Sequence, residues 1–188
     1  MTKHALDEVR EDHRNMALLL ELLRSDVEVL REGADDELDL ERVADIVDYF
    51  AHYPDRVHHP REETMFAVFR EQHKPSPELA DALKQVHAQH ERFPEMTADL
   101  SRLLEAAMHD APVSREELVA RLDDYIEQQI EHLDLEEGLV FPELDEKMTA
   151  KEWREVRNRG PYERDPIFGT EVQEAYVTLY RRLESFID

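Results

Sequence analysis

Cysteine is absent from this chain of 188 residues, and glycine occurs only four times. The absence of cysteine excludes disulfides, thiol catalysis and thiolate metal sites. Four glycines are too few for the glycine-rich loops of Rossmann and P-loop proteins, and their scarcity favours long helices. The chain also lacks any run of about 18 apolar residues, so the sequence predicts no transmembrane span. The charged residues 1–14 predict no signal peptide, and we expect a cytoplasmic protein.

Basic residues are few: 23 Lys and Arg stand against 46 Asp and Glu, which gives a formal net charge of −23. Such an acidic surface repels phosphate backbones and anionic lipid headgroups. Nucleic acids and membranes are therefore not expected partners. Hydrophobic residues make up 41% of the chain, enough for a core in a protein of this length.

Apolar residues recur at three- and four-residue steps over four long segments, a pattern that indicates amphipathic helices. The predicted long helices cover 2–32, 40–72, 76–108 and 114–147. Pro54, Pro60 and Pro94 are expected to kink or interrupt them. Four such helices with short links predict an all-α fold, an up-down-up-down antiparallel four-helix bundle.

The remaining residues predict a C-terminal helical appendage packed on that bundle. We expect one domain at 1–147 and the appendage at 148–188, with helices at 149–160 and 170–187. An Asp-Pro-Ile-Phe-Gly turn at 165–169 separates the two short helices.

Histidine is unusually frequent, and most of it lies on the four long helices. The ten histidines include His13, His52, His58, His59, His87, His90 and His132 on these helices. The second and fourth helices share a local pattern, in which His58 precedes Glu62 by four residues and His132 precedes Glu136 by four. Residues four apart lie on one side of a helix, so each pair can hold one ion or two adjacent ions.

A buried set of histidines and glutamates is costly unless a cation compensates it. Nitrogen and oxygen ligands without sulfur favour iron, manganese or zinc. Two carboxylates able to bridge, with four or more imidazoles, suit a pair of metals, and a function with oxygen would favour iron.

With these motifs, residues 1–147 resemble the hemerythrin family, the HHE cation-binding domain of bacterial type. The resemblance implies a four-helix bundle with a non-haem centre of two iron ions, held by histidines and two bridging carboxylates. The ligands that it implies here are His13, His58, Glu62, His90, His132 and Glu136, with His87 as a further candidate on the third helix. The chain departs from oxygen-carrying members in its His87-x-x-His90 spacing and in the step from His132 to Glu136.

Other residues near the motifs have two interpretations each. His59, Glu63 and Glu137 either ligate or are neighbours of the ligands, and we favour neighbours. Tyr49 and Tyr125 either donate hydrogen bonds to the centre or pack in the core. His52 and Tyr53 either close the pocket or end a turn.

The resemblance implies that the protein binds O2 or a related small ligand, NO or peroxide, for sensing, scavenging or delivery. One alternative is a redox enzyme that oxidises Fe(II) or reduces peroxide or NO. It ranks lower because the sequence shows no dedicated substrate pocket. Another alternative is a metal-dependent regulatory module whose tail, with the only tryptophan, Trp153, contacts a partner. The oligomeric state is left open.

Overall fold

The computed structural model of the chain describes residues 5–33, 39–109, 112–161 and 163–187, and these contain helices and no strand. The prediction of an all-helical protein is confirmed. The elements are α1 (Ala5–Glu32), α2 (Leu40–His52), η1 (Pro54–His58), α3 (His59–Gln72), α4 (Pro77–Met108), α5 (Arg115–Leu135), η2 (Glu136–Val140), α6 (Phe141–Lys147), α7 (Ala150–Arg159), η3 (Glu174–Tyr176) and α8 (Val177–Ile187).

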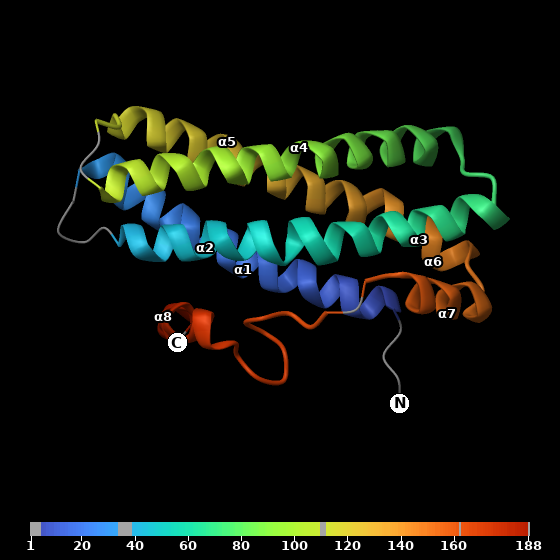
Figure 1. Ribbon diagram of the computed structural model, residues 1–188. Helices are drawn as coiled ribbons and strands as arrows, with labels where there is room; N and C mark the ends of the chain where they lie inside the picture. Colours follow the sequence, from blue (N-terminus) through green and yellow to red (C-terminus); the bar gives the residue numbers. More distant parts are fainter. Residues whose placement is uncertain (1–4, 34–38, 110–111, 162, 188) are drawn as a thin grey trace.

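Four helical rods lie lengthwise beside one another: α1, α2 continued by η1 and α3, α4, and α5 continued by η2 and α6 (Figure 1). The C-terminal elements lie along one side of these rods (Figure 1). There α7 contacts α1 and α3, and α8 contacts α1 and α2.

Two separate hydrophobic cores fill the space between the rods. One contains the side chains of α2, the second half of α1 and the first half of α5. The other contains the start of α1 together with α3, α6 and α7. On every rod the apolar residues of the two cores are separated by a short buried polar stretch that carries histidine, glutamate or both. The molecule therefore has a polar layer across its middle, with an apolar core on each side.

Two short π-helical turns interrupt the α-helical rods, one at the predicted interruption by Pro54 and one where the sequence predicts unbroken helix. The first, η1, begins at Pro54 and ends at His58, and the second, η2, begins at Glu136. A π turn accommodates one extra residue without ending the helix and often occurs at functional sites. Pro60 lies in the first turn of α3, where a missing N–H is tolerated. The rod consequently continues through both prolines (Figure 1).

Some predicted boundaries are wrong, and others lie outside the described residues. Pro94 does not interrupt α4, which runs as one helix from Pro77 to Met108. The start of the first predicted helix, residues 2–4, and most of the predicted loop, residues 34–38, lie outside the described part. Thr149 forms the capping box that the sequence predicts for α7, and its side chain accepts from the backbone N–H of Glu152.

The last helix starts later than predicted. The turn at 165–169 is present, and the Asp165 carboxylate accepts the backbone N–H groups of Ile167 (2.8 Å) and Phe168 (2.9 Å). The next residues are held away from helical geometry because the backbone N–H of Gln173 bonds to the carbonyl of Pro166 at 2.8 Å. Helix therefore resumes only at η3 and α8 rather than at 170.

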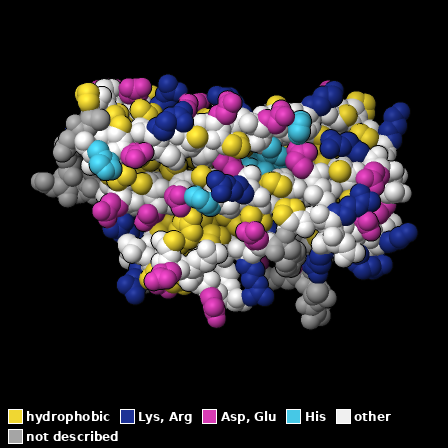
Figure 2. Space-filling model, in the orientation of Figure 1, with side chains coloured by type: hydrophobic (Ala, Val, Ile, Leu, Met, Phe, Trp, Pro, Cys, Tyr) yellow, Lys and Arg dark blue, Asp and Glu magenta, His cyan; other side chains and the backbone are white. Residues whose placement is uncertain are grey.

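No helix of the described segments combines the length and the apolar character needed to cross a membrane. On the face shown in Figure 2, Lys and Arg side chains are scattered among Asp and Glu rather than gathered in one patch.

Replacing each of two glycines by alanine is expected to change the free energy of unfolding in opposite directions. At Gly138, in η2, an added Cβ would meet nothing within 4 Å. We expect Gly138→Ala to raise the free energy of unfolding of the metal-free protein by about 0.5–1 kcal/mol, because alanine loses less backbone entropy in a helix. Denaturant unfolding followed by circular dichroism measures the change.

The matched variant is Gly169→Ala in the tail turn. There an added Cβ would lie 2.5 Å from the backbone oxygen of Asp165, which cannot rotate away. We expect this substitution to destabilise the protein by about 1–3 kcal/mol, as overpacking does elsewhere. Equal effects of the two substitutions would contradict this description of the turn.

Candidate metal centre

The polar layer brings together seven side chains from all four rods. They are His13 on α1, His58 at the end of η1, His59 and Glu62 on α3, His90 on α4, His132 on α5 and Glu136 at the start of η2. All are buried, and His58, Glu62, His132 and Glu136 are 0% exposed. Ligand atoms of His59, Glu62, His90 and His132 all lie within 4.8 Å of one another, and so do those of His13, His58 and Glu62. Glu62 thus belongs to two adjacent ligand groups.

The two carboxylates each lie between imidazoles from more than one helix. Glu62 Oε1 is 3.2 Å from the Nε2 atoms of both His13 and His58, and Glu62 Oε2 is 3.4 Å from His90 Nε2. Glu136 Oε2 is 3.4 Å from His13 Nε2 and 3.3 Å from His132 Nε2. Each carboxylate therefore faces imidazoles of at least two rods at once.

The outer nitrogens of four imidazoles face side-chain oxygens. Nδ1 of each ring lies 3.0–3.2 Å from an oxygen, in the pairs His13 with Glu137, His58 with Asp12, His90 with Glu63 and His132 with Gln89. An ionised carboxylate only accepts hydrogen bonds, so Nδ1 carries the proton toward it. In the neutral ring the lone pair is then on Nε2, which points into the layer, as in histidines that ligate a metal.

These pairings follow one rule around the molecule. Asp12 precedes His13 in sequence but bonds to His58 on the next rod, and Glu63 follows Glu62 but bonds to His90 on α4. Gln89 and Glu137 repeat the pattern toward α5 and α1. Neighbouring residues on a helix point about 100° apart. When one residue points into the layer, its neighbour therefore points sideways to the adjacent rod.

His59 joins the layer in a different way. Its ring stacks on that of His90, with centroids 4.5 Å apart and an interplanar angle of 17°. Its Nδ1 lies 3.5 Å from Asp55 Oδ1, and within the described chain neither ring nitrogen makes a hydrogen bond. Asp55 is itself positioned by the hydroxyl of Thr97, which donates to it at 2.7 Å.

Several buried atoms of the layer make no hydrogen bond with any described residue. They are the Nε2 atoms of His58, His90 and His132, both ring nitrogens of His59, Glu62 Oε2 and both oxygens of Glu136. An orphaned buried polar atom costs about 1–3 kcal/mol. Two ligands bound at right angles to one ion at about 2.0–2.2 Å lie about 3 Å apart. The closest nitrogen–oxygen distances here are 3.2–3.4 Å, so the residues fit a bound cation.

Charge and burial act against each other in this layer. Burial raises the pKa of Glu136, and the Glu62 carboxylate adds to that rise. Burial would also raise the pKa of Glu62, but the surrounding histidines hold it well below its usual range. Burial lowers the pKa of His59 and of His132 well below the usual value, so both imidazoles are neutral at neutral pH.

Of the predicted ligands, the layer contains all but His87. That side chain is 54% exposed and lies 3.0 Å from Glu63 Oε1 on the outside of the molecule. His59, which the sequence analysis favoured as a neighbour of the ligands, lies inside the layer instead. Its spacing of three residues from Glu62, less than one turn, was the available signal. Glu63 and Glu137 lie where neighbours of the ligands were expected.

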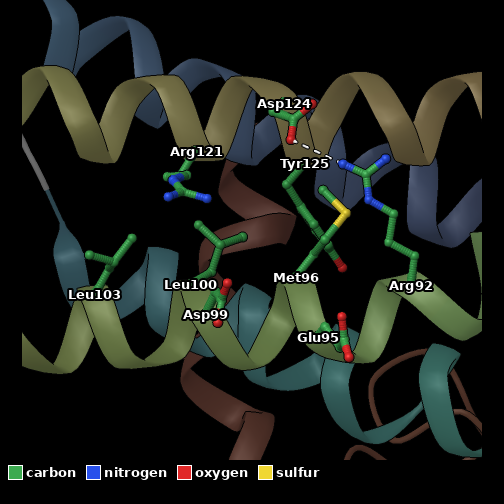
Figure 3. A pocket seen from close by; sticks show the side chains of 9 residues that line it. All are labelled: Arg92, Glu95, Met96, Asp99, Leu100, Leu103, Arg121, Asp124 and Tyr125. Atoms are coloured by element: carbon green, nitrogen blue, oxygen red, sulfur yellow. Dashed lines mark ion pairs between the residues drawn. The ribbon is translucent and has the colours of Figure 1, made fainter.

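Two of the surface cavities border α5, one of the rods that carry the layer. One of about 410 Å³, between α1 and α5, has His13 in its lining, with Ala17, Ile130 and Leu133 as apolar walls. The other, of about 190 Å³, lies between α4 and α5 and is lined by no residue of the layer (Figure 3). Its lining includes Tyr125, whose hydroxyl accepts from Gln129 at 3.0 Å.

The helical fold and the histidine–carboxylate layer define a helical protein that binds cations. Comparison with known families agrees: the hemerythrin HHE cation binding domain matches residues 4–152, most of the chain. The chain therefore belongs to the hemerythrin HHE cation-binding family, whose members bind metal ions, typically iron. No curated protein and no solved structure gives a significant match.

Metal binding at this layer should release protons. Burial would lower the pKa of His90, but the Glu62 and Glu63 carboxylates raise it to about 10. The pKa values of His13 and His58 are likewise raised by nearby carboxylates against the effect of burial. A cation must displace these protons, so we expect its affinity to rise from about pH 6.5, the ordinary histidine pKa, towards pH 10 and to fall on acidification.

Titration calorimetry with Co²⁺, in buffers of different ionisation enthalpy, measures the proton count. The expected result is net release at pH 7. Binding at pH 7 with no proton release would contradict the charge distribution derived above.

Proposed function

We propose that the layer holds two iron ions and binds O2 or a related small ligand, NO or peroxide, for sensing, scavenging or delivery. The observation that carries the proposal is the convergence of five imidazoles and two carboxylates on one buried layer. One octahedral ion takes about six ligands. Seven side chains around two groups that share Glu62 therefore favour a pair of ions over one.

In this proposal the ligands are His13, His58, His59, Glu62, His90, His132 and Glu136. Bound iron would supply reversible one-electron chemistry and an open position for a small ligand. The protein residues do the rest. The Nδ1 partners of His13, His58, His90 and His132 fix these four rings with Nε2 inward. The two carboxylates balance cationic charge, and the apolar cores on both sides exclude water.

The cavity between α1 and α5 gives such a ligand a way in. Its walls include Ala17, Ile130 and Leu133, which suit an uncharged diatomic molecule. His13, which is 4% exposed, also lines it, and so does Glu137, which is held by the Nε–H of Arg10 at 3.2 Å. A larger substrate would have to move this ion pair.

We also propose that residues 1–147 form an up-down-up-down antiparallel four-helix bundle and that 148–188 are an appendage. The four rods and the order of their links support this topology. The appendage contributes to both cores, with Trp153 in one and Leu179 in the other. We therefore expect it to fold together with the bundle.

Removing one central ligand tests the proposal. Glu62→Ala and His58→Ala should each lower the iron content sharply, because each removes a group that faces other ligands in the layer. Metal analysis of the purified chain, with circular dichroism to establish folding, gives the result. Folded variants with unchanged iron would overturn the assignment.

A matched pair of histidines makes a sharper test. His87 and His90 both bond to Glu63, but only His90 reaches the layer. We expect His90→Ala to lose iron and His87→Ala to keep the wild-type content. The opposite ranking would show that the third-helix ligand has been misassigned.

An optical spectrum distinguishes the possible uses of the centre. The protein is reduced without oxygen, exposed to air and deoxygenated again. A visible band that appears with O2 and disappears without it would establish reversible binding, and a one-way change would favour redox chemistry. Zinc in place of iron, or no metal, would overturn the oxygen-binding function.

A further inference from the structure

A cavity of about 460 Å³ lies where the tail meets the rod that contains α2 and η1. One wall consists of side chains from α2 and η1, and the other consists of tail residues between 163 and 176. Cavities of this size are typical of sites for small organic molecules. The family match ends at residue 152, so one whole wall lies outside the matched region. The family match therefore assigns no role to this cavity.

The tail wall is held in place by hydrogen bonds to its backbone. The backbone N–H of Gln173 bonds to the carbonyl of Pro166 at 2.8 Å, which closes the loop between them. Arg61, on α3, donates to the backbone oxygen of Glu163 at 3.2 Å and joins the start of this wall to the bundle. A wall that is fixed before a ligand arrives loses little conformational entropy when the ligand binds. The cavity can therefore accept a ligand without a new fold of the tail.

Two arginines line the cavity, one from each wall. Arg56, on η1, is exposed and makes no hydrogen bond or ion pair within the described residues. Arg164, in the tail, donates from Nη1 to the Thr170 hydroxyl at 2.5 Å and has no carboxylate partner in the described chain. A guanidinium presents a planar fork of N–H groups that matches a carboxylate or a phosphate. Both walls thus offer a cation to an anionic ligand.

The two carboxylates of the lining differ in how far they are already bonded. Asp48 Oδ2 accepts from the Tyr176 hydroxyl at 2.8 Å, and Asp48 Oδ1 lies 3.1 Å from His52 Nδ1. Glu163 is exposed, and its carboxylate makes no hydrogen bond or ion pair with a described residue. Two guanidinium groups without a carboxylate partner therefore face one unpaired carboxylate. This balance favours an anion over a cation.

Buried apolar surface completes the lining. Tyr53, Val57 and Tyr176 are 3%, 4% and 6% exposed. The hydroxyls of the two tyrosines already donate to carboxylates, that of Tyr53 to Asp12 at 3.1 Å and that of Tyr176 to Asp48 at 2.8 Å. The tyrosines therefore offer ring surface to a ligand rather than hydrogen-bond donors. Aromatic ring surface suits a flat apolar group.

We propose that this cavity binds a small organic anion, in which a carboxylate or phosphate meets Arg56 and Arg164 and a flat apolar body packs on the tyrosine rings. The chain carries a formal net charge of −23, and its overall field repels anions. Binding of an anion must therefore come from a local arrangement of this kind. No residue of the polar layer lines the cavity, so the proposal does not rest on iron at the candidate metal centre.

Titration calorimetry of the purified full chain with 2-naphthoate and with 2-naphthyl phosphate tests the proposal. We expect a single site per chain. Arg56→Gln and Arg164→Gln should each weaken binding about tenfold, as the loss of a charge-assisted hydrogen bond does. Arg92→Gln is the matched control, because Arg92 lines the separate cavity between α4 and α5 (Figure 3). It should keep the wild-type affinity, and circular dichroism establishes that each variant is folded.

Two further comparisons test the charge balance and the apolar lining. Glu163→Gln should strengthen binding of 2-naphthoate by about two- to fivefold, because it removes a negative charge from the lining. Acetate, which has the same charge but no ring, should bind about tenfold more weakly or less, since it buries little apolar surface. No gain in Glu163→Gln, or acetate binding as tight as that of 2-naphthoate, would contradict the proposal.

The other outcomes identify the ligand or overturn the site. Tighter binding of 2-naphthyl phosphate indicates a phosphate ester, and tighter binding of 2-naphthoate indicates a carboxylic acid. Absence of binding by both probes would overturn the proposal, and so would an equal loss of affinity in Arg92→Gln. Binding of the cation 2-naphthylmethylammonium as tightly as the two anions would also overturn it. None of these results depends on iron, so the proposed function is tested separately.

Discussion

The burial of seven titratable side chains in one layer is the constraint on which the rest of the structure depends. Left alone, their orphaned nitrogens and oxygens would cost about 1–3 kcal/mol each. The chain places this layer between two apolar cores, which hold the four rods in register on either side of it. Apolar packing in the two cores thus offsets the free-energy cost of the buried polar layer. A bound cation would compensate the charges of that layer.

The residues that hydrogen-bond to the imidazoles show how four packed helices can build such a layer. A ligand and its sequence neighbour point about 100° apart, so the neighbour meets the adjacent rod. Asp12, Gln89, Glu63 and Glu137 all act in this way, and the resulting ring passes through every rod. Each rod is therefore tied to the next by a bond that also sets the direction of an imidazole in the layer.

The sequence predicts those features of the site that depend only on the spacing of residues along one helix. The pairs His58 with Glu62 and His132 with Glu136 follow from the spacing of a helix. The π turns did not, because one extra residue barely changes an apolar period. The spacing also favours His59 as a neighbour of the candidate ligands, whereas its buried ring lies in the layer, stacked on His90. His87 was retained as a candidate because a sequence pattern does not show which of two nearby histidines points inward.

The tail is joined to the layer through buried polar contacts as well as through apolar packing. Arg61 donates to Asp12 at 3.0 Å and to the backbone oxygen of Glu163 at 3.2 Å. Asp12 in turn faces His58. A change in the charge on this imidazole therefore alters a bond network that ends on the tail backbone. The backbone of Glu163 is thus joined to the surroundings of the candidate metal centre, although the family match ends at residue 152.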